Sequence, residues 1–397
     1  MMHITNKELF FKYMGLPSLR PIGLEIVDAE GIFLYSADGK RYYDLVSGVT
    51  VSNLGHKNPA IIKAIKDQAD KYLHLMVYGE YIEAPQVLLA KKLADSLPDG
   101  LDCTYFVNSG SEAIEGAMKL AKRYTGRTGI ISFRDAYHGG THGALSVTGN
   151  ERMKNAFRPL LPDVTQIEFN NFEELHYITG RTVCVIAETI QAEAGIILPQ
   201  EGYLQALRKR CTEVGALLVI DDVQMGFGRT GRLFSYEHYG IVPDILVLAK
   251  ALGGGMPLGA FISSQEIMRS LTTEPELGHI TTFGGHPVSC AAALAHLEEL
   301  TKGNLIPEAE TKGKLFYDLM HKHAAIKEIR RAGLMLAIEI GDEEKMQKLY
   351  PVLLEHGIVT DLFLFKPSAF RISPPLIITE EQIKEVCNII IDCLDVI

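Results

Sequence analysis

Three charged residues lie at the ends of apolar runs or inside them, where a side chain can be held away from water. Asp221 ends the run ALLVID, Lys250 ends ILVLAK, and Arg371 interrupts the apolar segment AFRISPPLII. A lysine desolvated at the end of a strand can lose its proton and act as a nucleophile. The planar fork of an arginine suits a carboxylate. These residue types therefore indicate a nucleophilic lysine, an acid and an anion anchor.

Each of these residues also has a structural interpretation that the sequence leaves open. Backbone amides can satisfy a buried acid such as Asp221. The alkyl chain of Lys250 can carry its ammonium group to solvent. Arg371 can form a structural ion pair, and Glu193 in AETIQAEAG is a candidate partner under either interpretation.

A fourth candidate site is the segment FVNSGSEA, residues 106–113, which predicts a strand followed by a helix. Ser109 and Glu112 have the spacing of a capping box. Free amides at a helix N-terminus, with Gly110 allowing close approach and hydroxyls from Ser109 and Ser111, could bind a phosphate. The same serines could simply cap the helix, and the spacing matches neither the dinucleotide fingerprint nor the Walker loop.

Together the four sites supply what pyridoxal phosphate requires from a protein. They offer a phosphate site, an acid for the pyridine nitrogen, a lysine for a Schiff base, and an anchor for the acid group of a substrate. We therefore expect this cofactor at the place where the four sites meet.

The segments that must position these residues have the sequence pattern of an α/β fold. Between residues 56 and 300 short apolar runs alternate with segments of helical period, which predicts a mostly parallel sheet covered by helices. Open α/β sheets bind ligands beyond the carboxyl ends of their strands, which is where Asp221 lies. The predicted strands are residues 104–107, 129–133, 182–188, 216–221, 245–250 and 259–263.

Both chain ends have a mixed pattern and predict a smaller α+β domain. Residues 25–45 indicate a small meander with its turn at Asp38-Gly39. After residue 300 the pattern predicts helices near 305–322 and 343–357, a strand at 333–340 and a last helix capped by Thr379 and Gln382. We expect residues 1–55 to join the small domain, 56–300 to form the large domain, and 301–397 to complete the small one.

Composition excludes disordered, collagenous and disulfide-scaffold proteins. The 397 residues are 47% hydrophobic and 22% charged, as in ordinary globular proteins. A net charge of −10 with scattered Lys and Arg argues against nucleic acid. The six cysteines lack metal-ligand spacing, so we expect no metal site. No secretory signal is evident, and the uncharged segment 278–297 suits a membrane span poorly, which predicts a soluble protein. The widely spaced cysteines indicate the reduced cytoplasm as its setting.

The chain resembles the class III, or ω-amino acid, aminotransferases of pyridoxal-phosphate fold type I along nearly its whole length. The resemblance lies in LVIDDVQMGFGRTG (218–231) and DILVLAKALGGGMPLGA (244–260), with 29 residues from Asp221 to Lys250. Further matching segments are DGKRYYDLVSGVTVSNLGHKNP, AYHGGTHGALSVTG, TTFGGHPVSCAAALA and FRISPPLIITEEQI.

The resemblance implies roles for the residues that contact the cofactor ring. Lys250 would form the Schiff base and then shuttle the proton between the substrate carbon and C4′. Asp221 would keep the pyridine nitrogen protonated. Val223 and Tyr137 would sandwich the ring, although plain core packing also explains Tyr137. Gln224 would contact the phenolic oxygen.

The remaining implied roles concern the phosphate and the substrate. Gly110 and Ser111 would bind the phosphate together with Thr282 of a neighbouring subunit, which implies a homodimer. Arg371 matches the arginine that binds the α-carboxylate of glutamate, and Glu193 the acid that neutralises it when an ω-amine enters. Glu188 matches a second acid that faces the site.

The sequence departs from the family pattern at positions that bear on the substrate. Gly140 stands where many acetylornithine and ornithine enzymes have an arginine for a distal carboxylate. Ornithine δ-aminotransferases tend to place a tyrosine in the segment matching residues 47–52, and this chain has Val49 there. Asp222 and His286 replace a commoner Glu and Asn, near rather than on the cofactor.

The resemblance predicts a ping-pong aminotransferase that moves the terminal amino group of an acetylornithine- or ornithine-like donor to a 2-oxo acid, 2-oxoglutarate above all. Other donors on the same chemistry are 4-aminobutyrate, 2,4-diaminobutyrate and lysine. An aminomutase or decarboxylase could use the same lysine and aspartate. A binding protein that retains the fold without catalysis is a third interpretation, against which Lys250 and Asp221 argue.

Overall fold

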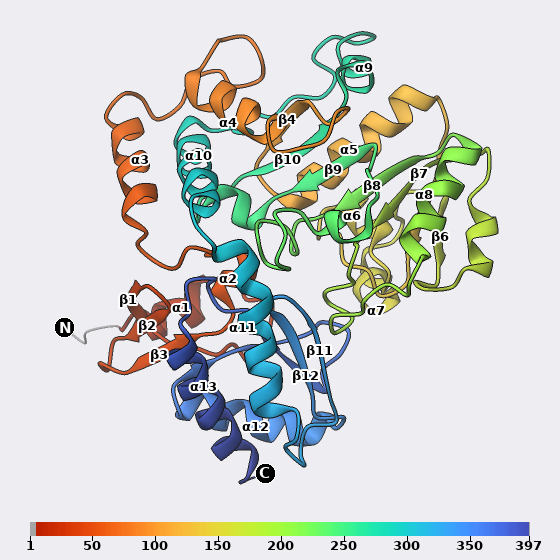
Figure 1. The fold of residues 1–397 in the computed structure, drawn as a ribbon. Helices are drawn as coiled ribbons and strands as arrows, with labels where there is room; N and C mark the ends of the chain where they lie inside the picture. The colour runs from red at the N-terminus through yellow and green to blue at the C-terminus, as the bar shows by residue number, and fades with distance from the viewer. Residues whose placement is uncertain (1–4, 397) are drawn as a thin grey trace.

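The computed structural model describes residues 5–396, and its central feature is a seven-stranded sheet (Figure 1). The strands lie in the order β4-β10-β9-β8-β7-β5-β6, and the run from β9 to β6 is parallel. The structure thus confirms the predicted α/β class. The strands are β4 (Cys103–Val107), β5 (Gly129–Phe133), β6 (Val164–Ile167), β7 (Thr182–Ala187), β8 (Leu217–Asp221), β9 (Ile245–Leu248) and β10 (Gly259–Ser263).

Two strands differ from what the sequence pattern indicates. Strand β10 is antiparallel to both neighbours, β4 and β9. Only residues 249–258 connect β9 to β10, and a parallel crossover needs a dozen residues or more, so the chain has to return in the opposite direction. Strand β6 was not predicted. It lies at the edge of the sheet, and its short sequence VTQI mixes polar and apolar residues.

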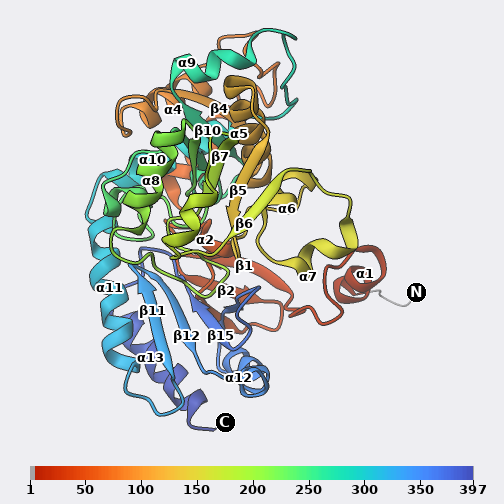
Figure 2. The same cartoon turned by 90° about the vertical axis from the view of Figure 1, so that its right-hand side faces the viewer.

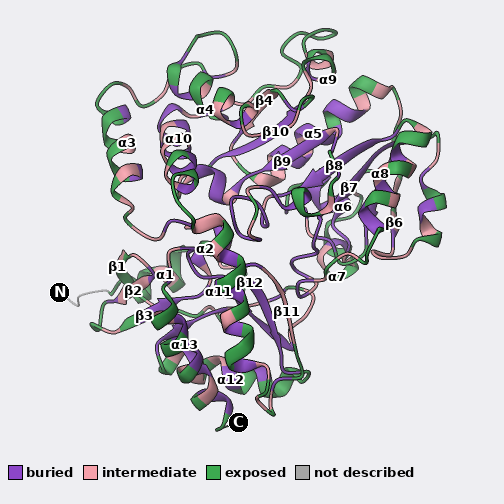
Figure 3. Cartoon of the chain, viewed as in Figure 1, coloured by how far each residue is buried: buried purple, intermediate pink, exposed green. Residues whose placement is uncertain are grey.

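Helices cover both faces of this sheet (Figures 1 and 2). Alternate residues of a strand point to opposite faces. Val219 therefore packs with α5 (Gly110–Thr125) and α6 (His142–Val147), whereas Ile220 packs with α8 (Tyr203–Val214) and α10 (Pro287–Thr301). Helices α3 (Pro59–Ala69) and α4 (Ala84–Ala94) pack on α10. Figure 3 shows the central strands buried between these layers.

Helix α5 begins directly after β4 and places its N-terminus at the carboxyl edge of the sheet. The Ser109 hydroxyl accepts the Glu112 N–H at 3.2 Å, as the capping-box spacing predicts. The reciprocal bond is absent, because the Glu112 carboxylate accepts the backbone and side-chain N–H groups of Asn108 at 2.7 and 2.8 Å. The helix ends at Gly126, which has a left-handed conformation.

The two chain ends combine in the lower part of the molecule in Figure 1. One sheet has the order β1-β2-β3-β13, so the C-terminal β13 pairs with β3 near the N-terminus. A second sheet has the order β11-β12-β15-β14. The division at residues 55 and 300 stays a prediction. The strands are β1 (Ile26–Glu30), β2 (Phe33–Ser36), β3 (Arg41–Asp44), β11 (Glu328–Ala332), β12 (Met335–Glu339), β13 (Ile358–Val359), β14 (Asp361–Leu362) and β15 (Ala369–Ile372).

Helices α11 (Leu305–Met320), α12 (Glu343–Glu355) and α13 (Glu380–Leu394) accompany these sheets. Both halves of the predicted capping box at Thr379 and Gln382 are present. The short helices are α1 (Asn6–Tyr13), α2 (Ser47–Thr50), α7 (Glu151–Lys154) and α9 (Gln265–Met268). The 3-10 segments are Asn155–Phe157, Glu173–Tyr177, Ser235–Tyr239, Lys250–Gly253 and Arg269–Leu271.

Within residues 5–396, no helix is both long and apolar enough to cross a membrane. The same residues contain no group of three or more His, Cys, Asp or Glu side chains that could hold a metal ion.

Candidate active site

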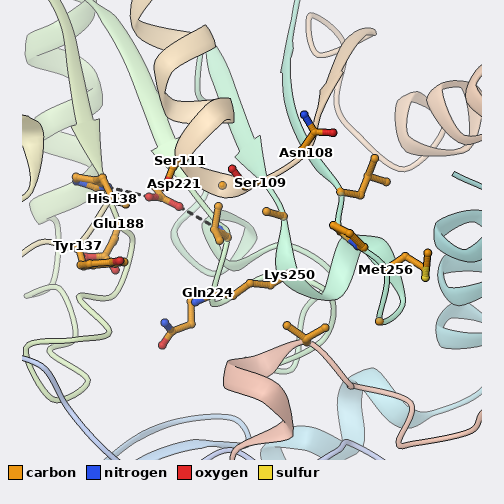
Figure 4. A pocket seen from close by; sticks show the side chains of 18 residues that line it. Asn108, Ser109, Ser111, Tyr137, His138, Glu188, Asp221, Gln224, Lys250 and Met256 are labelled. Atoms are coloured by element: carbon orange, nitrogen blue, oxygen red, sulfur yellow. Dashed lines mark hydrogen bonds and ion pairs between the residues drawn. The ribbon is translucent and has the colours of Figure 1, made fainter. Parts of the chain in front are cut away.

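A cavity of about 420 Å³ opens at the carboxyl edge of the central sheet (Figure 4). The ends of β4, β7, β8 and β9 meet there, because parallel strands finish at the same edge. Nine of the residues singled out from the sequence line it: Ser109, Gly110, Ser111, Tyr137, Glu188, Asp221, Val223, Gln224 and Lys250.

Asp221 is buried at the end of β8 and is held by two groups. Its Oδ2 lies 2.8 Å from Nδ1 of His138, and its Oδ1 accepts the Val223 N–H at 3.1 Å. The His138 side chain is fully buried, and its Nε2 has no hydrogen-bond partner among the described residues. The sequence interpretation missed His138. It stands next to Tyr137, but nothing in the sequence pairs it with an acid 83 residues away.

Lys250 lies outside the strand that was predicted to contain it. Strand β9 ends at Leu248, and Lys250 opens a 3-10 segment with a φ of 50°, a left-handed conformation that is uncommon outside glycine. This turn directs the lysine into the cavity (Figure 4). Burial lowers the pKa of Lys250 to about 8, with Glu193 opposing that shift and Arg371 adding to it. About a tenth of Lys250 is therefore an uncharged amine at pH 7, far more than for a lysine with an ordinary pKa.

The N-terminus of α5 forms another wall of the cavity. Amides in the first turn of a helix have no partner within it and favour anions. The Ser111 Oγ accepts the Gly140 N–H at 3.2 Å. Gly139, with a φ of 130°, approaches so closely that a Cβ would lie 2.1 Å from that Oγ. The backbone at Gly139 is thus packed against Ser111, and Gly110 and Ser111 at the start of α5 line the cavity.

Arg371 and Glu193 form a buried pair next to the cavity. Arg371 Nη2 donates to Glu193 Oε1 at 2.7 Å and Nη1 donates to Gln224 Oε1 at 3.1 Å. The Phe363 ring lies 4.7 Å from the guanidinium carbon. Burial alone would raise the pKa of Glu193, but Arg371 and the Leu364 N–H outweigh it, so this pKa is lowered. Glu193 therefore stays ionised, and its negative charge balances the positive charge of Arg371.

Glu188 links the two sides of the cavity. Its carboxylate accepts the Tyr137 and Ala192 N–H groups, both at 3.3 Å. Burial, and then the neighbouring Asp221, raise the pKa of Glu188 well above its usual range. Burial in this wall of the cavity therefore favours the protonated form of Glu188.

Several positions of interest lie outside the cavity. Thr282 is exposed and does not line it. Asp222 instead bonds to the backbone and hydroxyl of Ser235, and its burial raises its pKa to about 7. His286 caps α10 by accepting the Val288 N–H. At Gly140 an added Cβ would meet no atom within 4 Å.

Residue 49 does not line the cavity either. It belongs to α2, in which Ser47, Gly48, Val49 and Thr50 all have positive φ, between 54° and 63°. Val51, directly after this left-handed turn, is the side chain of this segment that reaches the cavity.

Comparison with known proteins decides the family. The model of the aminotransferase class-III family matches residues 17–394. The chain belongs to the class III aminotransferases. It is 38% identical over 391 residues to the acetylornithine aminotransferase of Methanopyrus kandleri, covering 98% of each chain. It is 40% identical over 380 residues to that of Caldanaerobacter subterraneus, covering 93% of this chain and 94% of the other.

Solved structures of transaminases have the same fold. The ornithine aminotransferase of Toxoplasma gondii superposes with a TM-score of 0.91 at 28% identity, covering 99% of this chain and 96% of the other. A transaminase from Virgibacillus gives 0.91 at 25% identity, with 98% of each chain covered. These findings confirm the resemblance and place this aminotransferase in fold type I.

The cofactor of this aminotransferase is pyridoxal 5′-phosphate, and the residues of the cavity fit it. A buried amine, an acid with a buried imidazole behind it, and the open N-terminus of α5 all border one cavity. They match the aldehyde, the ring nitrogen and the phosphate of the cofactor.

Proposed function

We propose that this aminotransferase moves the terminal amino group of a small ω-amino acid to a 2-oxo acid, 2-oxoglutarate, in two half-reactions. The buried Arg371–Glu193 pair beside the cavity carries the proposal. While paired, Arg371 presents no free charge to an amine whose reacting end lacks a carboxylate. When Glu193 withdraws, the guanidinium can bind the carboxylate of a 2-oxo acid bidentately. The names of the relatives support an acetylornithine- or ornithine-like donor.

The catalytic roles belong to Lys250 and Asp221. When bound, pyridoxal phosphate supplies a carbonyl that takes up amines and a ring that accepts the electron pair of a broken C–H bond. Lys250 Nζ holds the cofactor and, once released, takes the proton from the substrate carbon and returns it to the cofactor side. Asp221 holds a proton on the ring nitrogen, and His138 keeps the Asp221 carboxylate in place.

The other cavity residues orient the cofactor. Tyr137 and Val223 take the two faces of the ring, and Gln224 the phenolic oxygen. Gly110 and Ser111 bind the phosphate at the start of α5.

Thr282 is exposed on this chain and would reach the site of a second copy, so the active enzyme is a homodimer in this proposal. We place it in the cytoplasm.

The absence of a side chain at Gly140 favours a second group of amino donors. Without an arginine there, a distal carboxylate has one fewer anchor. 4-Aminobutyrate, 2,4-diaminobutyrate and lysine therefore remain candidates beside acetylornithine and ornithine.

A screen of these amines against the holoenzyme tests the proposal. Each donor is added without an oxo acid, and the loss of the absorption band of the lysine-linked cofactor is followed. An aminotransferase stops after one cofactor equivalent of product and resumes when 2-oxoglutarate is added. Continued turnover without an oxo acid would instead identify an aminomutase or decarboxylase, and conversion by no ω-amine would contradict the proposal.

A further inference from the structure

A second acidic residue lies beside Arg371. In the sheet β11-β12-β15-β14, Asp361 of β14 stands directly opposite Arg371 of β15. Directly opposed residues of antiparallel strands project to the same face, with Cβ atoms about 4.5–5.5 Å apart. On the other side of Arg371, the opposed residue of β12 is Ala337. Arg371 therefore has a small apolar neighbour on one strand and an acid on the other.

Asp361 has a free oxygen. Its Oδ1 accepts the Leu362 N–H at 2.9 Å, and within residues 5–396 it has no ion-pair partner within 4.0 Å. Its side chain is half-buried. Burial raises the pKa of Asp361, although Arg371 opposes this shift. This acid is thus close enough to Arg371 to feel its charge, but it is not its hydrogen-bond partner.

The segment after Asp361 builds the surroundings of the Arg371–Glu193 pair. Phe363 lies against the guanidinium, and the Leu364 N–H donates to Glu193 Oε2 at 3.1 Å. The Phe365 N–H donates to the Glu193 carbonyl, also at 3.1 Å. Because residues 361–365 hold both members of the pair, Asp361 has a fixed position relative to Arg371.

The charges around Arg371 then oppose an incoming carboxylate. Glu193 and Asp361 already place two negative charges near one guanidinium. A substrate carboxylate that takes the place of Glu193 at Arg371 would still lie next to Asp361, and like charges at this range in a partly buried site repel appreciably. An ω-amine donor adds no negative charge at this point. The arrangement therefore distinguishes the two substrates of one cavity.

We propose that Asp361 is a specificity-determining residue that disfavours carboxylates at Arg371 when ionised, so that binding of the 2-oxo acid is accompanied by uptake of a proton at Asp361. This inference rests on the proposed function, because it assigns Arg371 to the substrate carboxylate.

The groups that face Asp361 leave it as the residue that titrates. Arg371 is a guanidinium and stays charged. The pKa of Glu193 is lowered, chiefly by Arg371 acting against burial, so it stays ionised. Burial raises the pKa of Tyr350, whose hydroxyl donates to the Thr360 carbonyl at 3.1 Å, to about 12, and it stays neutral. Lys250 also acts on Asp361, but in the loaded enzyme its Nζ is bound to the cofactor.

Binding of glutarate to the holoenzyme tests this role without turnover. Glutarate has two carboxylates but neither an amine nor an oxo group, so it binds without reacting. Titration calorimetry at pH 6 and pH 8 compares the wild type with Asp361→Asn, which keeps the acceptor for the Leu362 N–H. Asp392→Asn on the exposed face of α13 is the matched control for the change in charge.

We expect Asp361→Asn to bind glutarate about ten-fold more tightly than the wild type at pH 8, with a difference that becomes smaller as the pH falls towards the raised pKa of Asp361. Wild-type binding should strengthen as the pH falls, because protonation removes the charge of Asp361. Repetition in buffers of different ionisation enthalpy should reveal proton uptake in the wild type and in Asp392→Asn, and less of it in Asp361→Asn. Asp361→Ser tests the same loss of charge if the first variant does not fold.

Equal affinities of the wild type and Asp361→Asn at pH 8 would overturn the role of Asp361. So would failure of the wild type to bind glutarate at either pH, because Arg371 would then not be a carboxylate site. The proposed function is tested separately by conversion of the wild-type absorption band with an ω-amine. If that conversion occurs and the affinities are equal, the role of Asp361 fails while the proposed function stands.

Discussion

At the scale of single residues, the site depends on charged groups whose ordinary ionisation is changed by burial. Burial and the nearby Arg371 bring the pKa of Lys250 down to about 8, although Glu193 opposes them. Glu188 changes in the opposite direction, since burial penalises its charged form. The same low-polarity surroundings therefore favour the uncharged amine of Lys250 and the protonated form of Glu188. Both states suit a site that moves protons.

Attachment of the cofactor should follow the ionisation of Lys250. The Nζ must lose its proton before it can bond to an aldehyde carbon, so we expect the rate of attachment to the apoenzyme to rise about ten-fold per pH unit up to pH 8. Above pH 8 the rate should level off, whereas a lysine with an ordinary pKa of 10.5 would give a continued rise. Stopped-flow absorbance measures it. Lys250→Ala should fold, show no attachment and have no turnover, and undiminished transamination by that variant would contradict the assignment.

Gly140→Arg should strengthen the recognition of 2-oxoglutarate. The position offers open space for a side chain, and an arginine there could reach a distal carboxylate. We expect KM for 2-oxoglutarate to fall roughly three- to ten-fold. KM for pyruvate, which has no distal carboxylate, should stay unchanged. Gly140→Gln controls for size, and an equal effect of both variants on both oxo acids would show that the added charge is not responsible.

At the scale of elements, the site is made of the short connections that follow the strands. Asp221 ends the parallel strand β8, Glu188 and the loop with Tyr137 each come directly after a parallel strand, and α5 follows β4 after only two residues. Such connections hold the backbone in uncommon conformations, as at Lys250 and Gly139. The sheet edge thus sets where the residues meet, and the loops set how they point.

The connection at Gly139 can be tested directly. In Gly139→Ala the new Cβ would lie 2.1 Å from the Ser111 Oγ and 3.0 Å from its Cα, at a φ of 130° that L-residues avoid. The phosphate wall has to shift, and we expect cofactor affinity to fall roughly ten-fold or more. Titration of the apoenzyme with pyridoxal phosphate measures this. Gly180→Ala meets no atom within 4 Å and should leave the affinity unchanged; a comparable loss there would point to a general effect on the fold.

The sequence predicts a position well where it depends on the residues of a single helix or strand. Strand ends placed Asp221 beside the site, and capping residues gave the starts of α5 and α13. The sequence does not predict contacts between two segments that are far apart in the chain. Neither the bond between His138 and Asp221 nor the register that sets Asp361 opposite Arg371 is visible in local spacing. The reversed β10 follows from a short connection whose conformation the apolar pattern does not encode.

At the scale of the whole molecule, one buried arginine joins three parts of the fold. Arg229, in the loop after β8, donates to Asn53 Oδ1 at 2.7 Å, to the Leu334 carbonyl at 3.0 Å and to the Pro374 carbonyl at 2.6 Å. These acceptors belong to the segment that leads to α3 and to both chain regions flanking β12 and β15. Burial lowers the pKa of Arg229 to about 9, opposed by Asp44. The hydrogen bonds of Arg229 therefore connect the loop after β8 of the large sheet to segments next to the terminal sheets.

Replacement of this residue should weaken the whole molecule. Arg229→Ala leaves three buried acceptors without their donor and opens space in the core, so we expect the free energy of unfolding to fall by roughly 2–4 kcal/mol. Arg232→Ala, an exposed arginine of the same loop, should change it by about 0.5 kcal/mol or less. Urea unfolding of the apoenzyme followed by circular dichroism compares the two variants. Equal stability of both would mean that packing alone, without the Arg229 hydrogen bonds, holds the terminal sheets against the central one.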